Sequence, residues 1–208
     1  MSDSIYLEPA KAGQTLLQMQ NTLKKFNDEI REIGVQLKST ALITYSEPLT
    51  KALGHTSQEL NNIGHAVNAG VYAFSHAFVN VIEEWKKTDA QAAASISFKK
   101  PHFEDIHLVY HKAHKLHVSP MDMLKGINTI EDGGGMLRNY FEDMDDLIRD
   151  SVHYWRGESA SHTRESWRRH IEPLKESTVK TVVNVAEMMR EELGAFMKRD
   201  SQNFPGKW

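Results

Sequence analysis

The stretch YWRGESASHTRESW, residues 154–167, decides how the rest of the sequence is interpreted. It carries Trp155 and Trp167 on either side of Gly157, at the point where one amphipathic pattern ends and another begins. Glycine tolerates the left-handed backbone that a tight antiparallel connection needs, and a tryptophan ring offers a broad apolar surface that can cover the end of a helix pair. The stretch therefore predicts a corner between two helices, with Trp155 and Gly157 as its central residues.

Apolar residues recur on both sides of this corner at steps of three, four and seven, which is the spacing of a helix with one apolar face. The stripe before the corner consists of Leu137, Phe141, Met144, Ile148, Val152 and Trp155. The stripe after it consists of Trp167, Ile171, Leu174, Val182, Val185, Met189, Leu193 and Phe196. Because glycine lowers helix propensity by about 1 kcal/mol and an internal proline removes a backbone hydrogen bond, we predict a break at residues 133–135 and a kink at Pro173.

The first half of the chain is organised in the same way. One stripe consists of Leu16, Met19, Leu23, Phe26, Ile30, Ile33 and Leu37. A second consists of Leu49, Leu53, Leu60, Ile63, Val67, Phe74, Phe78, Val81 and Trp85. Between them, Ser46 can cap a new helix with Pro48 in its first turn, and Tyr45 occupies the place that Trp155 has in the second half.

Landmarks of the two halves recur after about 110 residues, as expected of a duplicated unit: Tyr45 matches Trp155, and Trp85 matches Phe196. Two unrelated hairpins of similar length would align in the same way, so both interpretations stay open. Either way, the sequence predicts an all-α fold in which two tandem antiparallel helical hairpins form a four-helix bundle. The predicted segments are a first hairpin at 1–93 with the corner YSEP, a histidine-rich linker at 94–118, and a second hairpin with a C-terminal tail at 119–208.

The linker carries two further signals. Phe103, Ile106, Tyr110 and Ala113 fall on one face of a helix, which predicts a short helix lying on the bundle. The same segment is rich in histidine, and His107, His111 and His114 are the candidates for a metal site. A solvated helix face is the simpler interpretation, so no metal or other cofactor is predicted.

Composition excludes several classes of function. The 25 Lys and Arg against 28 Asp and Glu give a net charge of −3, which offers no basic field for nucleic acid. The absence of cysteine excludes disulfides and thiolate chemistry. No apolar run is long enough to span a membrane, and the N-terminus lacks the pattern of a general secretory signal. Since no catalytic motif is recognisable, an enzyme is not expected.

With the corner and the hairpins defined, the chain resembles the WXG family of ESAT-like proteins, which are handled by type VII secretion. The triplet WRG, residues 155–157, sits between two helices as it does in that family. The resemblance implies an export signal of the form Tyr, three residues, then Asp or Glu, just beyond the second helix of a hairpin. Phe196 and Asp200 in the second hairpin, and Trp85 and Asp89 in the first, have that spacing, although neither pair has the family's tyrosine.

The resemblance also implies how the protein acts. Members of the family pair as antiparallel heterodimers, so this chain resembles such a pair fused into one polypeptide. The expected partners are the secretion ATPase or a cognate secreted protein, and a homodimer is left open. Phe204 and Trp208 in the C-terminal tail are the expected partner contacts. The protein would be made in the cytoplasm and secreted without a general signal peptide.

Two other hypotheses belong to different classes. One is a metal-binding helical bundle that uses the linker histidines. The other is an intracellular coiled-coil adaptor in which Trp155 serves only to pack the core.

Overall fold

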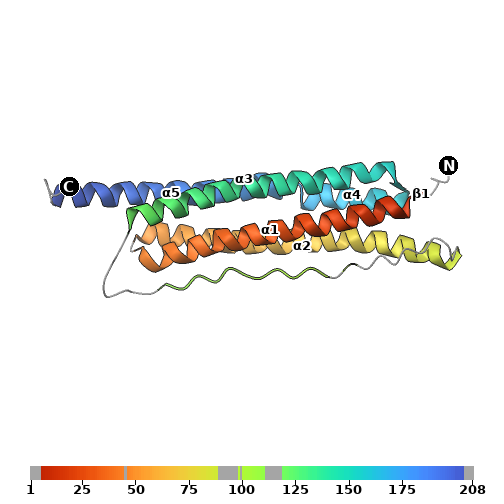
Figure 1. The fold of residues 1–208 in the computed structure, drawn as a ribbon, viewed down its shortest axis with the longest axis horizontal. Coiled ribbons are helices and arrows are strands. Elements are labelled where there is room, and N and C mark those ends of the chain that lie inside the picture. Colours follow the sequence, from red (N-terminus) through yellow and green to blue (C-terminus); the bar gives the residue numbers. More distant parts are fainter. Residues whose placement is uncertain (1–5, 45, 89–97, 99, 111–118, 204–208) are drawn as a thin grey trace. The chain divides into compact units, whose positions relative to one another are not determined.

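The computed structural model describes residues 6–44, 46–88, 98, 100–110 and 119–203. Helices dominate this part of the chain (Figure 1), as the periodicity predicts. The elements are β1 (Tyr6–Leu7), α1 (Pro9–Ile43), α2 (Glu47–Thr88), α3 (Pro120–Asp150), the 3₁₀ turn η2 (Ser151–His153), β2 (Trp155–Arg156), α4 (Glu158–His170) and α5 (Leu174–Asn203). No helix in the described residues is sufficiently long and apolar to cross a membrane.

The start of α2 follows the predicted capping chemistry. The N–H of Leu49 donates to Oγ of Ser46 at 3.4 Å, so the serine side chain satisfies one of the free amides of the first turn. Pro48 lies in that turn, where a missing N–H has no consequence. Tyr45, the predicted corner residue between α1 and α2, lies outside the described residues.

The chain divides into two compact units, and each unit combines three separate pieces of the sequence. The first unit consists of Met1–Asp28, Ile63–Phe103 and Arg138–Lys175, and the second of Glu29–Asn62, Glu104–Leu137 and Glu176–Trp208. Each unit therefore takes residues from the first predicted hairpin, the linker and the second predicted hairpin. The tandem arrangement of two hairpins stays a prediction.

The core of the first unit is built from the predicted stripes. Its buried residues include Leu16, Met19, Leu23, Phe26, Val67, Phe74, Phe78, Phe141, Met144, Ile148, Trp155 and Trp167. The rings of Phe26 and Phe141 meet edge to face with centroids 5.2 Å apart, which joins α1 to α3. Beside them, the side-chain amides of Asn27 and Asn68 donate to each other at 3.0 and 2.8 Å, so the polar groups of this pair are satisfied between α1 and α2.

The core of the second unit takes further residues of these stripes, together with Ile127 and Ile130 of α3, which the stripes did not include. Its buried residues include Ile30, Ile33, Leu37, Leu49, Leu53, Leu60, Ile127, Ile130, Leu137, Val182, Val185 and Met189. At its surface, Arg190 of α5 makes a two-pronged ion pair with Glu131 of α3, at 2.5 and 2.7 Å. This contact holds the pKa of the Glu131 carboxyl below its ordinary value, because the hydrogen bonds from Arg190 favour the charged form.

The predicted break at residues 133–135 is wrong, because α3 runs without interruption from Pro120 to Asp150. A β-carbon on Gly133 would lie 2.8 Å from Cγ1 of Ile33, and one on Gly134 would lie 3.1 Å from Cγ1 of Val182. These two glycines therefore allow α3 to approach α1 and α5 closely. What these glycines contribute is the absence of a side chain, not the conformational freedom of their backbone.

The predicted kink at Pro173 is a complete break. Helix α4 ends at His170, residues 171–173 form a turn, and α5 begins at Leu174. The N–H groups of Ile171 and Glu172 both donate to the carbonyl of Trp167, at 2.8 and 3.2 Å. Because Pro173 has no N–H to donate to a carbonyl of the preceding turn, α4 does not continue through this position.

The predicted linker helix is also wrong for the residues that the structure describes. Residues 100–110 contain no helix and run as an extended trace (Figure 1). Phe103 and Ile106 are nevertheless buried, as the pattern predicts. We refer to residues 103–110 as the strap.

Candidate functional site at the WRG corner

The connection between α3 and α4 is more elaborate than a simple helical corner. After α3 ends at Asp150, the chain makes the turn η2 and the short strand β2 before α4 begins. Strand β2 pairs antiparallel with β1, with Leu7 opposite Trp155. The N–H of Glu8 also donates to the carbonyl of Tyr154 at 2.9 Å. Residues near the N-terminus of the chain thus form part of the corner, which the sequence pattern did not indicate.

Trp155 lies at the centre of an aromatic cluster. Its side chain is only 1% exposed. The ring centroid is 4.2 Å from that of Phe78 and 5.8 Å from that of Phe74, both on α2. Tyr154 stacks on the other side of the cluster against Phe78, and its hydroxyl shares a 2.5 Å hydrogen bond with Oγ1 of Thr15 on α1. The corner is therefore joined to both α1 and α2.

Gly157 has the backbone geometry that the sequence assigns to it. Its φ of 126° is the only positive φ among the described residues. It precedes α4 as the capping residue, and its carbonyl accepts from the N–H of Ser161 at 3.0 Å. Since L side chains rarely adopt this conformation, another residue here would strain the turn.

Arg164 holds the corner from inside α4, a role that the sequence pattern does not predict. Its Nη1 donates to the carbonyl of Trp155 at 3.0 Å and to Oγ of Ser151 at 3.2 Å. Burial lowers the pKa of the Arg164 guanidinium, because the charged form loses part of its hydration. A half-buried cation with these hydrogen bonds fixes the start of α4 against the strand that carries Trp155.

Trp167, the second tryptophan of the stretch, connects α4 to α3. Its Nε1 donates to Oδ1 of Asp145 at 2.7 Å, and Nζ of Lys175 lies 3.9 Å from the other carboxylate oxygen. Burial raises the pKa of the Asp145 carboxyl, while the hydrogen bond from Trp167 and the charge of Lys175 act in the opposite direction. The carboxylate positions the indole.

A cleft of about 520 Å³ lies between α2 and α4 in the first unit. Its lining consists of Ala66, Ala69, Gly70, Ala73, Phe74, His162, Thr163, Ser166, Trp167, His170 and Ile171. The α2 wall is made of small residues, and a β-carbon on Gly70 would lie 2.7 Å from Cγ1 of Ile171. The α4 wall is polar.

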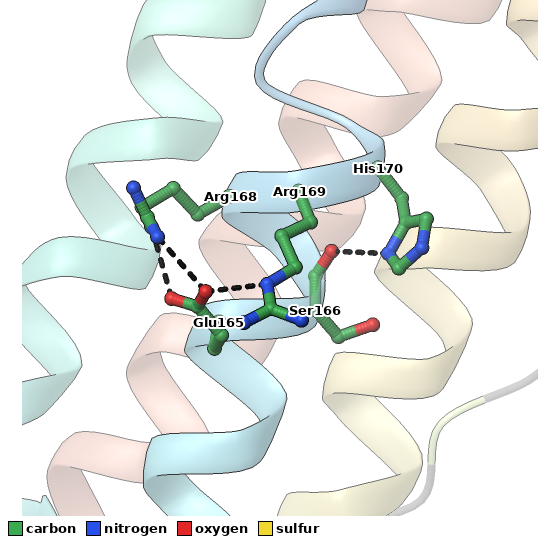
Figure 2. Close-up of polar contacts among 5 residues, drawn as sticks. All are labelled: Glu165, Ser166, Arg168, Arg169 and His170. Carbon is green, nitrogen blue, oxygen red and sulfur yellow. Dashed lines mark hydrogen bonds and ion pairs between the residues drawn. The ribbon is translucent and has the colours of Figure 1, made fainter.

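The polar side of α4 is organised around Glu165 (Figure 2). The Arg168 guanidinium donates to both carboxylate oxygens at 2.8 and 2.9 Å, and Nε of Arg169 donates to one of them at 2.5 Å. These bonds lower the pKa of Glu165 to about 2. Close by, Nδ1 of His170 lies 2.8 Å from the carbonyl oxygen of Ser166. Both guanidinium groups bond to a carboxylate of the same helix, so this cluster resembles a stabilised surface more than a reactive centre.

A second concave surface lies in the second unit, between the start of α3 and the end of α5. This apolar groove, of about 530 Å³, is lined by Ser119, Pro120, Met121, Leu124, Leu193, Phe196, Met197 and Asp200. Met121 is 75% exposed there. Two of the predicted export-signal residues, Phe196 and Asp200, are thus brought together on one wall. The groove itself had no recognisable signal in the sequence.

Other predicted site residues fall outside what the structure describes. Asp89, Phe204 and Trp208 lie outside the described residues. Trp85 is part of α2, but its side chain is not described. The first predicted export pair and the predicted tail contacts therefore have no geometry to compare.

Only one of the three predicted metal-binding histidines is among the described residues. His107 lies on the exposed side of the strap, while His111 and His114 are outside the described residues. Within the part of the chain that the structure describes, no three His, Cys, Asp or Glu side chains gather in a way that could hold a metal ion.

No family model, curated protein or solved structure matches this chain. The resemblance to the WXG family therefore stays a prediction that depends on the corner and its surroundings.

Proposed function

We propose that the protein is a non-enzymatic substrate or carrier of type VII secretion that acts through protein contacts, as a fused counterpart of a WXG heterodimer. The observation that supports this proposal best is the WRG corner. Trp155 is buried against two phenylalanines of α2, and Gly157 supplies the single positive φ of the described residues.

The corner favours a structural role for the triplet. Arg164 and the β1–β2 pair lock the strand that carries Trp155, so the turn is rigid and its aromatic residue is not available to a ligand. A rigid corner with a buried tryptophan suits a helical protein that is recognised by its surface. This agrees with the role expected of WXG-like proteins.

The apolar groove supplies a surface for that recognition. Phe196 and Asp200 stand one helical turn apart on α5, beside the exposed side chains of Met121 and Met197. Apolar grooves of this kind commonly receive an apolar side chain or an amphipathic helix of a partner. We infer that the secretion machinery or a cognate secreted protein contacts the chain here.

The test is an export assay in a bacterium that has a type VII secretion system. The full chain is expressed in that strain and in a derivative that lacks the secretion ATPase, and the fraction in the culture medium is compared with a cytoplasmic marker. We expect export only in the strain with the ATPase. A chain lacking residues 196–208 and the variant Phe196→Ser should both stay in the cell.

The matched control is Arg199→Ala, which changes an exposed residue of the same helical turn outside the groove. It should be exported like the unmodified chain. Equal amounts in the medium with and without the ATPase would contradict the proposal. Retention of the full chain in both strains would also contradict it and would favour the intracellular adaptor.

A further inference from the structure

The strap is held by its backbone at one point in the second unit. The N–H of Ile106 donates to Oδ1 of Asn61 at 2.7 Å, and Nδ2 of Asn61 donates back to the carbonyl of Ile106 at 3.1 Å. Oγ of Ser57 donates to the same carbonyl at 3.1 Å. One side-chain amide on α2 thus satisfies both main-chain groups of a residue that has no regular secondary structure. We refer to the hydrogen bonds of Asn61 and Ser57 with the main chain of Ile106 as the clamp. Because these bonds involve only main-chain groups of the strap, they can hold an extended backbone whatever side chain it carries.

Two side chains of the strap, those of Ile106 and Tyr110, lie against glycines of the helices. Ile106 is 5% exposed, and a β-carbon on Gly34 of α1 would lie 2.9 Å from its Cγ1. Four residues later, Tyr110 lies over Gly54 of α2, and its hydroxyl donates to the carbonyl of Thr50 at 3.2 Å. Glycine inside a helix lowers stability relative to alanine. Gly34 therefore acts as a notch for Ile106, whereas a β-carbon on Gly54 would lie at an ordinary contact distance of 3.4 Å from the Tyr110 hydroxyl.

The first unit continues the same pattern at Phe103. A β-carbon on Gly64 would lie 2.2 Å from Cζ of Phe103, and the ring meets His65 edge to face with centroids 5.1 Å apart. Phe103 is buried, whereas His107 and Val109 are exposed. Within the second unit, the strap therefore contacts the helices at Ile106 and Tyr110, while the side chains of His107 and Val109 are exposed to solvent.

We propose that the face of α1 and α2 around Asn61 and Gly34 is a binding site for an extended peptide segment, which the chain fills with its own strap. The partner that fits is an extended segment of another protein with a branched aliphatic residue at the clamp and a tyrosine four positions later. This site is separate from the apolar groove and does not depend on the proposed export.

The strap competes with any such partner. A tethered segment acts at an effective concentration of about a millimolar, so a free peptide at micromolar concentration does not displace it. The site becomes available when Ile106 of the strap no longer occupies it. A charge at position 106 does this, because an aspartate side chain cannot occupy the apolar notch over Gly34 without losing its hydration.

The experiment uses the full chain and a fluorescently labelled synthetic peptide of residues 100–110, with binding followed by fluorescence anisotropy. Ile106→Asp should bind the peptide at least about tenfold more tightly than the unmodified chain, since its site is vacant. Val109→Asp adds the same charge at an exposed position of the strap and should bind like the unmodified chain. Adding Asn61→Ala to Ile106→Asp should weaken binding by about tenfold, because the clamp is lost.

Circular dichroism establishes that each variant is folded. If Ile106→Asp does not fold, the milder Ile106→Ala takes its place with the same expectations. A folded variant that binds the peptide no better than the unmodified chain, or with no dependence on Asn61, would overturn the proposal. A dimer of the unmodified chain in light scattering that disappears in Ile106→Asp would identify a second copy as the occupant and would overturn the assignment to another protein.

Discussion

The triple glycine of α3 lies within a helix, whereas the strap is extended, and in each region the local residues favour the other conformation. Residues 133–135 have poor helix propensity and yet lie within an unbroken helix. Residues 103–110 have a helical apolar pattern and yet are extended. In both regions a glycine lies under a side chain of a neighbouring segment: Gly133 under Ile33, and Gly34 under Ile106.

Packing against neighbouring segments, not local propensity, therefore decides these two conformations. In α3 the glycines permit close helix contacts whose burial outweighs the lost propensity. In the strap, the side chain of Asn61 forms hydrogen bonds with the N–H and the carbonyl of Ile106. These two main-chain groups therefore do not need hydrogen-bond partners within a helix.

The largest effect is expected from Gly133→Val. Its β-carbon would lie 2.8 Å from Cγ1 of Ile33 and 2.9 Å from Oε1 of Glu29, so α3 has to move away from α1. We expect the free energy of unfolding to fall by about 2–3 kcal/mol, as is typical of overpacked cores. Urea denaturation followed by circular dichroism measures it. An unchanged midpoint would mean that the close approach of the two helices is not required.

The second effect concerns the clamp. Asn61→Ala leaves the N–H of Ile106 without its partner, while Ser57 still donates to the carbonyl. We expect a loss of about 1–2 kcal/mol in unfolding free energy, the usual result of leaving a buried donor unsatisfied. Asn62→Ala is the matched control, because Asn62 is the exposed neighbour on α2. Equal losses in both variants would show that helix propensity, not the clamp, is being measured.

The third prediction is an increase in the free energy of unfolding instead of a decrease. Gly135 has no atom within 4 Å of the place where its β-carbon would lie, unlike the two glycines before it. Gly135→Ala should therefore raise the free energy of unfolding by about 0.5–1 kcal/mol through helix propensity alone. Thermal denaturation provides the measurement. A lower melting temperature would mean that the third glycine also has a conformational or packing role.

The smallest effect is expected at Glu29, the half-buried carboxylate beside Gly133. Burial raises its pKa above the ordinary 4.5, and the charges of Glu32 and Asp132 add to the shift. The folded state therefore favours the protonated form. The stability that Glu29 contributes is fully present below pH 4.5 and is lost as the pH rises through the raised pKa.

Glu29→Gln imitates the protonated form and should melt at a higher temperature than the unmodified chain at pH 7. The difference should disappear when the melting temperature is measured below pH 4.5. Glu191→Gln, at an exposed position of α5, is the control and should show no such dependence. A variant that is less stable at pH 7 would contradict the assigned direction of the shift.

The sequence alone predicts much of the helical core. The apolar stripes identify buried residues such as Phe26, Phe141 and Trp155, because a seven-residue spacing has few other interpretations. The positive φ of Gly157 follows from the corner that its neighbours define. These features are predictable because they depend on residues close together in the chain.

The remaining features depend on contacts between distant residues. The pairing of β1 with β2, the hydrogen bonds of Arg164 and the clamp of Asn61 each join segments that no periodicity relates. The pattern of the strap predicts the wrong conformation, because the spacing of Phe103, Ile106 and Tyr110 suits a helix as well as an extended segment with separated contacts. Only the notch at Gly34 of α1 distinguishes the two.

Amide hydrogen exchange of the strap, measured by NMR in the full chain, tests most directly whether Asn61 holds an extended segment. Our expectation is extended-type chemical shifts across residues 103–110 and much slower exchange at Ile106, whose N–H is bonded to Asn61, than at the exposed Val109. Helical chemical shifts in this segment, with equal exchange rates at the two positions, would contradict it.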